Sequence, residues 1–325
     1  MRSRRAVSLR QPQAALLRAL DLLALPFVGA AALLLLAVRR TGLQRLPACR
    51  RALVRIGLLP VRRHYYEPFL DPRELGRGSP EREIIGIDWN IGGQLALLDE
   101  LRFEGEIPDL DGPRKEPLEF RLNNGAFESG DAEFLYQMIR ARKPKRFIEI
   151  GSGQSTLIVR RALQRNREES PGYECRHVCI EPFEAPWLEQ LGVTVLRKRV
   201  EAVDGAVFGE LEENDFLFVD SSHVIRPQGD VLSEYLRIIP SLRSGVIVHI
   251  HDIFSPREYP REWLAERMWL WNEQYLLEAL LIGNPSWRII GAVNLLRHNH
   301  FDALRRVCPY LTAQREPGSF YMQKV

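Results

Sequence analysis

The sequence predicts an α/β protein built on a doubly wound, mostly parallel seven-stranded sheet, with a helical N-terminal extension. From Asp131 to the C-terminus, short apolar stretches alternate with stretches of helical spacing, which is typical of such sheets. The first apolar stretch runs through a glycine turn directly into a helix. In addition, acids stand at the ends of four apolar stretches. Because ligands bind beyond the carboxyl ends of parallel strands, this pattern also predicts a site.

The expected core elements follow from the apolar spacing along the chain. Ala132, Leu135 and Ile139 share one helical face, and Asp131 can cap the helix that carries them. Short apolar runs bounded by polar or glycine residues indicate buried strands. The expected strands span residues 146–150, 177–180, 193–196, 215–219, 245–250, 287–296 and 319–325, and the expected helices span residues 92–103, 131–142, 155–167, 230–239 and 263–281.

The N-terminal region differs from the rest of the chain in charge. Residues 1–63 hold 13 arginines and one acid, a net charge of +12, whereas the whole chain carries only +3. The basic segment indicates a membrane or another anionic surface as its partner, and the acidic remainder argues against nucleic acid. We expect a basic, apolar segment at residues 1–63, a linker or accessory region at residues 64–122 and the core domain at residues 123–325.

Residues 22–38 form an uncharged apolar run that is followed at once by Arg39 and Arg40. Its length reaches the lower limit of the roughly 17–25 residues that span a bilayer. Arginines are more frequent after the run than before it, which favours a cytoplasmic C-terminal side. We expect a membrane anchor at 22–38 and an interfacial helix within 43–61, with the body on the cytoplasmic face of the membrane. The alternative is a cytoplasmic protein with a buried or interfacial helix.

The string RFIEIGSGQST, residues 146–156, is the most informative motif. The turn Gly151-Ser152-Gly153 between a strand and a helix directs free backbone N–H groups and the positive helix end at a ligand. Thr156 stands where the dinucleotide pattern GxGxxG has its third glycine. An acid followed at once by GxG is instead typical of the nucleoside-binding opening of S-adenosylmethionine (SAM) enzymes.

Polar residues also follow the later strands. Glu181 ends the second strand, where a carboxylate can accept hydrogen bonds from ribose hydroxyls. Asp220 and His223 lie three residues apart in FVDSSH, a spacing at which they share a substrate proton or a metal, and we expect His223 to be the base. His251 and Asp252 end the fifth strand. Together with Asp220 they offer a ligand set for a divalent cation such as magnesium.

Taken together, these motifs resemble class I SAM-dependent methyltransferases, and in particular those with a "methyltransferase domain 24". The resemblance covers about residues 123–296 and is carried by NNGAFESGDAEFLY, EIGSGQST, CIEPF, FVDSSH, GVIVHIHDIF and WNEQYLLEALL. It implies a Rossmann-like fold with SAM as cofactor. It also implies that the methionine and ribose parts of SAM lie against Glu149, Gly151, Ser152, Gly153 and Ser155, with the ribose hydroxyls on Glu181.

The resemblance bears on the metal as well. Metal-dependent catechol-type and sugar O-methyltransferases carry an Asp after strand four and an acidic pair after strand five. Asp220 and Asp252 match two of these ligands, and His251 replaces the third. The sequence DSSH stands where methyltransferases of exocyclic base amino groups carry NPPY or DPPY, which argues against a nucleic-acid acceptor.

The expected function is O-methylation of a small-molecule, sugar, or lipid- or glycan-linked hydroxyl. Two alternatives come from other classes of protein. One is an NAD-dependent sugar oxidoreductase, which the missing third glycine disfavours. The other is a non-catalytic, membrane-associated scaffold of the same fold, which the acids at the strand ends disfavour.

Overall fold

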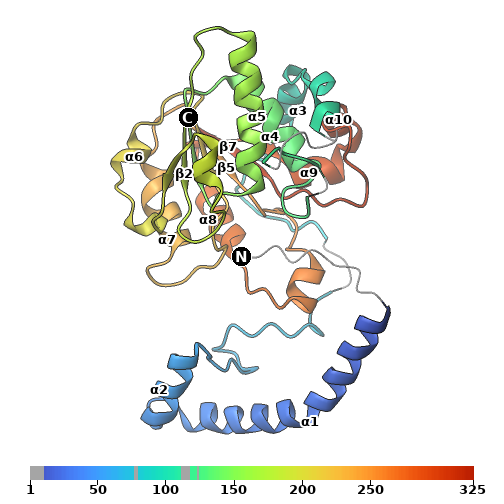
Figure 1. Cartoon of the computed structure of the whole chain (residues 1–325), viewed down its shortest axis with the longest axis vertical. Coiled ribbons are helices and arrows are strands. Elements are labelled where there is room, and N and C mark those ends of the chain that lie inside the picture. Colours follow the sequence, from blue (N-terminus) through green and yellow to red (C-terminus); the bar gives the residue numbers. More distant parts are fainter. Residues whose placement is uncertain (1–10, 77–79, 111–117, 123) are drawn as a thin grey trace. The chain divides into compact units, whose positions relative to one another are not determined.

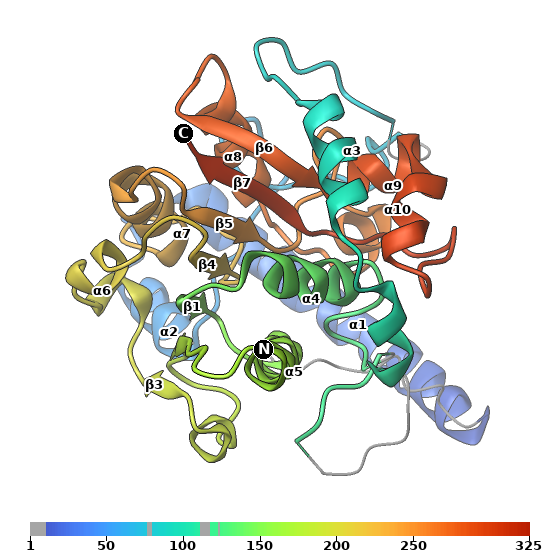
Figure 2. The same cartoon turned by 90° about the horizontal axis from the view of Figure 1, so that it is seen from above.

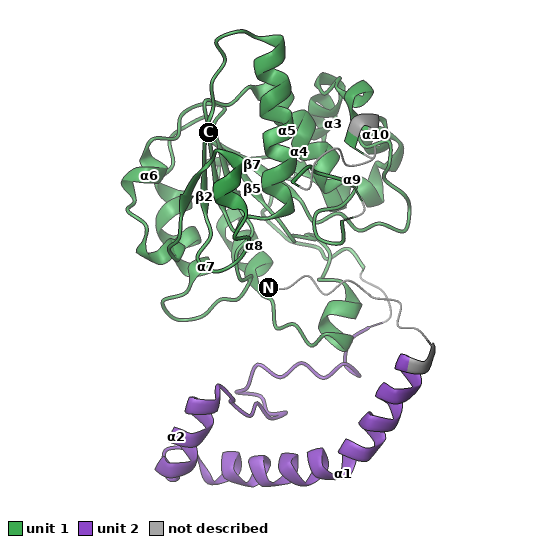
Figure 3. Cartoon of the chain, viewed as in Figure 1, with its two compact units in different colours: residues 1, 77–325 green, residues 2–76 purple. Residues whose placement is uncertain are grey.

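The computed structural model describes residues 11–76, 80–110, 118–122 and 124–325 (Figure 1). The chain divides into two compact units, residues 2–76 and residues 77–325 together with residue 1 (Figure 3). Asn123, the expected first residue of the core domain, lies outside the described residues. The domain boundaries that we expect from the sequence stay predictions.

The larger unit contains the predicted sheet. Its seven strands lie in the order β3-β2-β1-β4-β5-β7-β6, and all neighbours pair in parallel except β7, which is antiparallel to β5 and β6 (Figure 2). The predicted fold class is therefore confirmed. The strands are β1 Arg146–Ile150, β2 Arg176–Ile180, β3 Thr194–Leu196, β4 Phe216–Val219, β5 Ile247–Ile250, β6 Trp287–Ala292 and β7 Phe320–Lys324.

Helices cover both faces of this sheet. Helices α3, α4, α5, α9 and α10 lie on one side, and α6, α7 and α8 lie on the other (Figure 2). The α-helices of this unit are α3 Ile91–Glu100, α4 Asp131–Arg142, α5 Gln154–Glu169, α6 Ala206–Gly209, α7 Asp230–Ser233, α8 Glu273–Leu281, α9 Val293–Asn299 and α10 Phe301–Val307. Short 3-10 or π turns are η1 Glu104–Leu110, η2 Leu188–Leu191, η3 Val200–Ala202, η4 Glu234–Ile238, η5 Ile239–Ser241 and η6 Glu262–Glu266.

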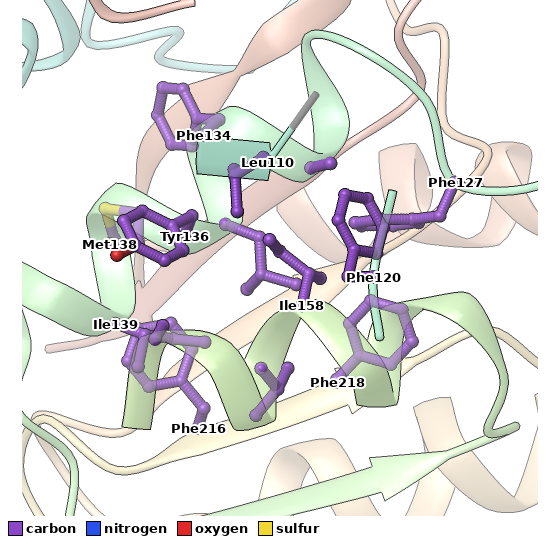
Figure 4. Packing of buried hydrophobic residues seen from close by; sticks show 14 of the residues in the cluster. Leu110, Phe120, Phe127, Phe134, Tyr136, Met138, Ile139, Ile158, Phe216 and Phe218 are labelled. Carbon is purple, nitrogen blue, oxygen red and sulfur yellow. The ribbon is translucent and has the colours of Figure 1, made fainter. Parts of the chain in front are cut away.

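Alternation along the strands produces two hydrophobic cores. In β4, Phe216 and Phe218 enter the core under α4 and α5, whereas Leu217 and Val219 enter the core on the opposite face. Figure 4 shows Phe216 and Phe218 beneath Ile158 of α5. All five of these side chains are buried. Because both faces are covered, the strands read as continuous apolar runs in the sequence.

One expected helix, residues 263–281, is wrong as a single element. Only its second half, α8, is α-helical, and the first half is the π turn η6 followed by an irregular segment. Met268 in this segment has a left-handed backbone, with φ of 53°. Trp269 stacks on Trp271 with ring centroids 4.4 Å apart, and both rings contact Trp263. Tertiary packing of these indoles therefore overrides the helical spacing.

The expected strand at 287–296 is also wrong in its second half. Strand β6 ends at Ala292, which is paired with Phe320, and the next residues form α9. An apolar run such as AVNLL does not distinguish a strand from a buried helix by periodicity. The helix expected at 230–239 starts where predicted but continues as the π turn η4, and Pro240 follows in η5.

The smaller unit contains two helices, α1 Gln11–Thr41 and α2 Pro47–Ile56. By length and composition, residues 13–41 of α1 are able to cross a membrane, and none of its apolar window is buried. Helix α2 has no buried residue, and its arginines alternate with the exposed Val54 and Ile56. The structure therefore contains helices at both positions, and the anchor expected at 22–38 and the interfacial helix expected within 43–61 stay predictions.

Candidate active site

The glycine turn after β1 is held between the ends of two neighbouring strands. Gly151 has φ of +78°, and its N–H donates to the carbonyl oxygen of Ile180 at 3.0 Å. A Cβ atom at Gly151 would lie 1.9 Å from the carbonyl oxygen of Asp220. Only glycine therefore fits this position.

The second half of the turn has free space and free polar atoms. A Cβ atom at Gly153 would meet no atom within 4 Å. Within the described part of the chain, the buried atoms Ser152 Oγ and Gln154 Oε1 have no hydrogen-bond partner. They stand at the N-terminus of the 16-residue helix α5, where backbone N–H groups face outward. Unpaired buried polar atoms around open space fit a polar ligand.

Glu181 lies beside this turn at the end of β2. Its Oε1 accepts hydrogen bonds from the backbone N–H groups of Phe183 and Glu184, both at 2.8 Å. Its Oε2 is 3.4 Å from the N atom of Ser152, which is a weak bond, so this oxygen keeps acceptor capacity. The loop after β2 therefore fixes one carboxylate oxygen and leaves the other available to a ligand.

Glu149 and Ser155 do not face the open space at the glycine turn, because both side chains are buried. Glu149 is fully buried, and its carboxylate accepts hydrogen bonds from Ser155 Oγ at 2.5 Å and from Thr156 Oγ1 at 2.7 Å. His177 Nε2 lies 3.2 Å from the same carboxylate, and Cys179 Sγ lies 3.5 Å from it. This buried acid links the first turn of α5 to β1 and β2 by hydrogen bonds and so fixes the position of the glycine turn.

Asp220, His223 and Asp252 meet beyond the ends of β4 and β5. His223 Nε2 lies 3.2 Å from Asp220 Oδ1 and 3.6 Å from Asp252 Oδ2. One ligand atom from each of the three residues lies within 4.8 Å of the other two. His223 and Asp252 both have left-handed backbones, with φ of 59°, which is uncommon outside glycine and is met at functional sites.

Glu273 is a member of this group that the sequence analysis missed. It lies at the start of α8, is fully buried, and its Oε2 is 2.8 Å from His223 Nδ1. This contact fixes the proton of His223 on Nδ1 and points Nε2 at the two aspartates. The ring of Trp271 lies 4.3 Å from that of His223. The signal that could have revealed Glu273 was the motif WNEQ, which was interpreted only as part of a helix.

His251 occupies the other side of the aspartate pair. Its Nδ1 is 3.6 Å from Asp220 Oδ1 and 3.6 Å from Asp252 Oδ1, and it has no hydrogen-bond partner among the residues that are described. Its Nε2 is 3.7 Å from Asp131 Oδ2. The predicted metal set of Asp220, His251 and Asp252 is thus brought together, with an unpartnered nitrogen between the two acids.

The cluster concentrates negative charge at a place that is only partly exposed to solvent. Burial raises the pKa of Asp252, and it would also raise that of Asp220, but the neighbouring His251 and His223 outweigh this effect and hold the pKa of Asp220 well below its usual range. Burial works against a charged His223, yet its hydrogen bonds with Asp220 and Glu273 raise its pKa well above normal. The arrangement therefore favours a bound positive charge, either a proton or a cation.

Comparison with known proteins gives three kinds of similarity. The family model described as "Methyltransferase domain" matches residues 148–253. An uncharacterized protein of Archaeoglobus fulgidus is 30% identical over 166 residues, which cover 46% of this chain and 73% of that protein. The residues matched by the family model include the glycine turn, Glu181, Asp220, His223, His251 and Asp252. Glu273 lies outside the matched range.

Solved structures are also similar. An O-methyltransferase from Bacillus cereus in complex with SAH is 16% identical, with a TM-score of 0.37, and the match covers 71% of this chain and 90% of that one. An O-methyltransferase from Streptomyces achromogenes in complex with SAM is 15% identical, with a TM-score of 0.35, and the match covers 74% and 92%.

Proposed function

Because the chain belongs to the methyltransferase-domain family, we propose that it is a SAM-dependent O-methyltransferase. The observation that carries this proposal is the glycine turn, in which unpartnered polar atoms and open space at Gly153 lie beside the half-used carboxylate of Glu181. A charged amino-acid group next to the N-terminus of α5, with ribose hydroxyls on Glu181, satisfies these groups.

The predicted cofactor residues divide into two roles under this proposal. Gly151, Ser152, Gly153 and Glu181 contact SAM. Glu149 and Ser155, whose side chains bond to each other in the interior, hold the turn in place and do not touch the cofactor. SAM, when bound, supplies a methyl group on a sulfonium, which is an excellent leaving centre, so the protein mainly aligns the acceptor and removes its proton.

His223 is the proposed base. Its Nδ1–H donates to Glu273, so in the deprotonated ring, which the raised pKa of His223 makes prevalent only at alkaline pH, Nε2 carries the lone pair that takes the proton from the acceptor hydroxyl. The acceptor oxygen then forms its bond to the methyl carbon while the carbon–sulfur bond breaks. Asp220, 3.2 Å from Nε2, stabilises the imidazolium that results. Glu273 acts as a positioning residue, since it fixes the tautomer and the direction of the ring.

A divalent cation fits beside this base. Asp220 and Asp252 provide carboxylate oxygens, and the unpartnered Nδ1 of His251 is equally distant from both acids. The two carboxylates suit magnesium or manganese, and the imidazole of His251 is the ligand that fits these ions less well. A cation held there would lower the pKa of the acceptor hydroxyl. His223 remains free for the proton.

The smaller unit supports the location that we propose and, through it, the proposed acceptor. Its exposed apolar helix and its arginines support attachment to the cytoplasmic face of a membrane. A body held there meets hydroxyls of lipid-linked or glycan-linked molecules, and small sugars, more readily than it meets nucleic acid. We therefore propose a hydroxyl acceptor of that class.

The test is transfer of labelled methyl groups. The full chain, purified in detergent, is incubated with SAM carrying a deuterated methyl and with envelope and soluble extracts of cells that lack the protein. The proposal predicts label in an O-methyl ether in the envelope extract, and no label with the His223→Ala variant. Label on nitrogen or carbon atoms, or equal labelling by His223→Ala, contradicts the proposed chemistry.

A further inference from the structure

We propose that the smaller unit holds the phosphate of an anionic phospholipid in a cavity at the C-terminal end of α1. The cavity has a volume of about 270 Å³ and is lined by four arginines, one acid and the turn that follows α1. The charged lining residues are Arg39, Arg40, Arg45, Arg62 and Glu67. The inference rests on the proposed membrane attachment and is independent of the methyl transfer.

The only acid in the lining is already used. Glu67 accepts two hydrogen bonds from Arg39, at 2.7 and 2.9 Å, and one from Arg62 Nε at 3.2 Å. The hydrogen bond from Arg39 is the main cause that lowers the pKa of Glu67, so the carboxylate is charged. Arg40 and Arg45 also line the cavity and have no acidic partner within the described ranges. Four guanidinium groups against one carboxylate leave an excess of three positive charges, which calls for an anion.

The position of the cavity, directly after a helix long enough to cross a membrane, indicates that the anion is a lipid phosphate. The uncharged run of residues 22–38 has a helical length of roughly 26 Å, close to the thickness of the bilayer hydrocarbon. Arg39 and Arg40 come directly after it, at the depth of lipid phosphates. Tyr65 and Tyr66, which follow Arg62 in the chain, are 93% and 85% exposed. Exposed tyrosines are typical of the membrane interface.

Phosphate chemistry matches this lining. A guanidinium group donates two parallel hydrogen bonds to a pair of phosphate oxygens, and Arg39 keeps its buried Nε without a partner among the described residues. The arginines of α2 differ, because Arg50, Arg51 and Arg55 do not line the cavity, although they are exposed like Arg40 and Arg45. They provide general attraction to an anionic surface. They are therefore the matched control for a specific site.

The experiment compares two double variants with the same loss of charge. The full chain, Arg40→Gln/Arg45→Gln and Arg50→Gln/Arg51→Gln are each placed in nanodiscs of equal parts phosphatidylglycerol and phosphatidylcholine. After stepwise removal of lipid by detergent, mass spectrometry of the intact protein counts retained phosphatidylglycerol. We expect the wild type to retain it, the cavity variant to retain about tenfold less, and the α2 variant to stay within about twofold of wild type.

Three outcomes overturn the proposal. Equal loss in both double variants means general attraction without a specific site. Displacement of the lipid by inorganic phosphate or glycerol phosphate at equal concentration means that the cavity takes free phosphate. Release of all lipid by the wild type means that no site exists. Binding of S-adenosylhomocysteine by the same preparations is measured in parallel, so that a failure here is distinguished from a failure of the methyltransferase proposal.

Discussion

Gly151→Ala should destabilise the larger unit, because the added methyl group has no space at the end of β1. The new Cβ would lie 1.9 Å from the carbonyl oxygen of Asp220, whereas ordinary contact begins at 3.4 Å, so that carbonyl must move by about 1.5 Å. The positive φ costs alanine about 1–2 kcal/mol. Displacement of Asp220 also weakens its N–H bond to Ile150, worth about 1 kcal/mol. The sum is about 2–3 kcal/mol, or a fall in Tm of about 4–12 °C.

Gly153→Ala should act differently. Its backbone is extended, with φ of −175°, and the new methyl group would meet no protein atom. We expect the free energy of unfolding to stay within about 1 kcal/mol of wild type. If the cofactor fills the open space, the same methyl group overpacks the complex, which typically costs about 1–3 kcal/mol. Affinity for S-adenosylhomocysteine should then fall by about tenfold or more.

The assays are thermal unfolding followed by circular dichroism and calorimetric titration with S-adenosylhomocysteine, both on the full chain in detergent. Gly205→Ala is the matched control, because it also has open space around its Cβ but lies outside the site. It should leave both measurements unchanged. Wild-type affinity in Gly153→Ala would refute the placement of the cofactor at this turn. An unchanged Tm in Gly151→Ala would refute the packing argument.

The remaining predictions concern the base, the cation and the core. Glu273→Gln should lower the rate of methyl transfer by about tenfold or more and leave the affinity for S-adenosylhomocysteine unchanged. The reason is that the variant loses the carboxylate that orients the His223 ring but does not touch the cofactor. Equal loss of rate and affinity indicates a merely structural role. His251→Ala should abolish binding of Mn²⁺ in calorimetry whereas His223→Ala should retain it, and the opposite result assigns the metal to His223. Phe216→Ala should lower the free energy of unfolding by about 3–5 kcal/mol in urea, because this buried ring stacks on Phe147, and a loss under 1 kcal/mol contradicts the packing.

The parts of the fold that the sequence predicts are those in which local pattern and tertiary packing agree. Strand β1 and helix α4 have the expected boundaries, because apolar spacing, glycine and capping residues all indicate the same limits. The helix expected before α8 is wrong, since three tryptophans pack on one another there and one of them, Trp271, contacts His223. No local pattern encodes these contacts. The run after Ala292 was wrong because a buried strand and a buried helix have the same composition.

The sequence predicts which candidate site residues stand at strand ends, but not where their side chains point. Acids at the ends of parallel strands lie along one edge of the sheet, so the sequence predicts Glu181, Asp220 and Asp252 as site residues. The direction of each side chain was beyond the pattern. Glu149 belongs to the same motif yet points into the core, and Glu273 reaches His223 across 50 positions in the chain. Such contacts depend on the packing of α8 and are absent from any local motif.

The most direct test of the central claim is calorimetric titration of the full chain with S-adenosylhomocysteine, alongside Glu181→Gln. This variant keeps one side-chain oxygen for the N–H groups of Phe183 and Glu184 but loses the charge that faces the ribose. The account predicts saturable one-to-one binding by the wild type. In Glu181→Gln it predicts that the affinity falls by about tenfold or more while the Tm stays unchanged. Absence of binding heat and of any thermal shift with the wild type would contradict it.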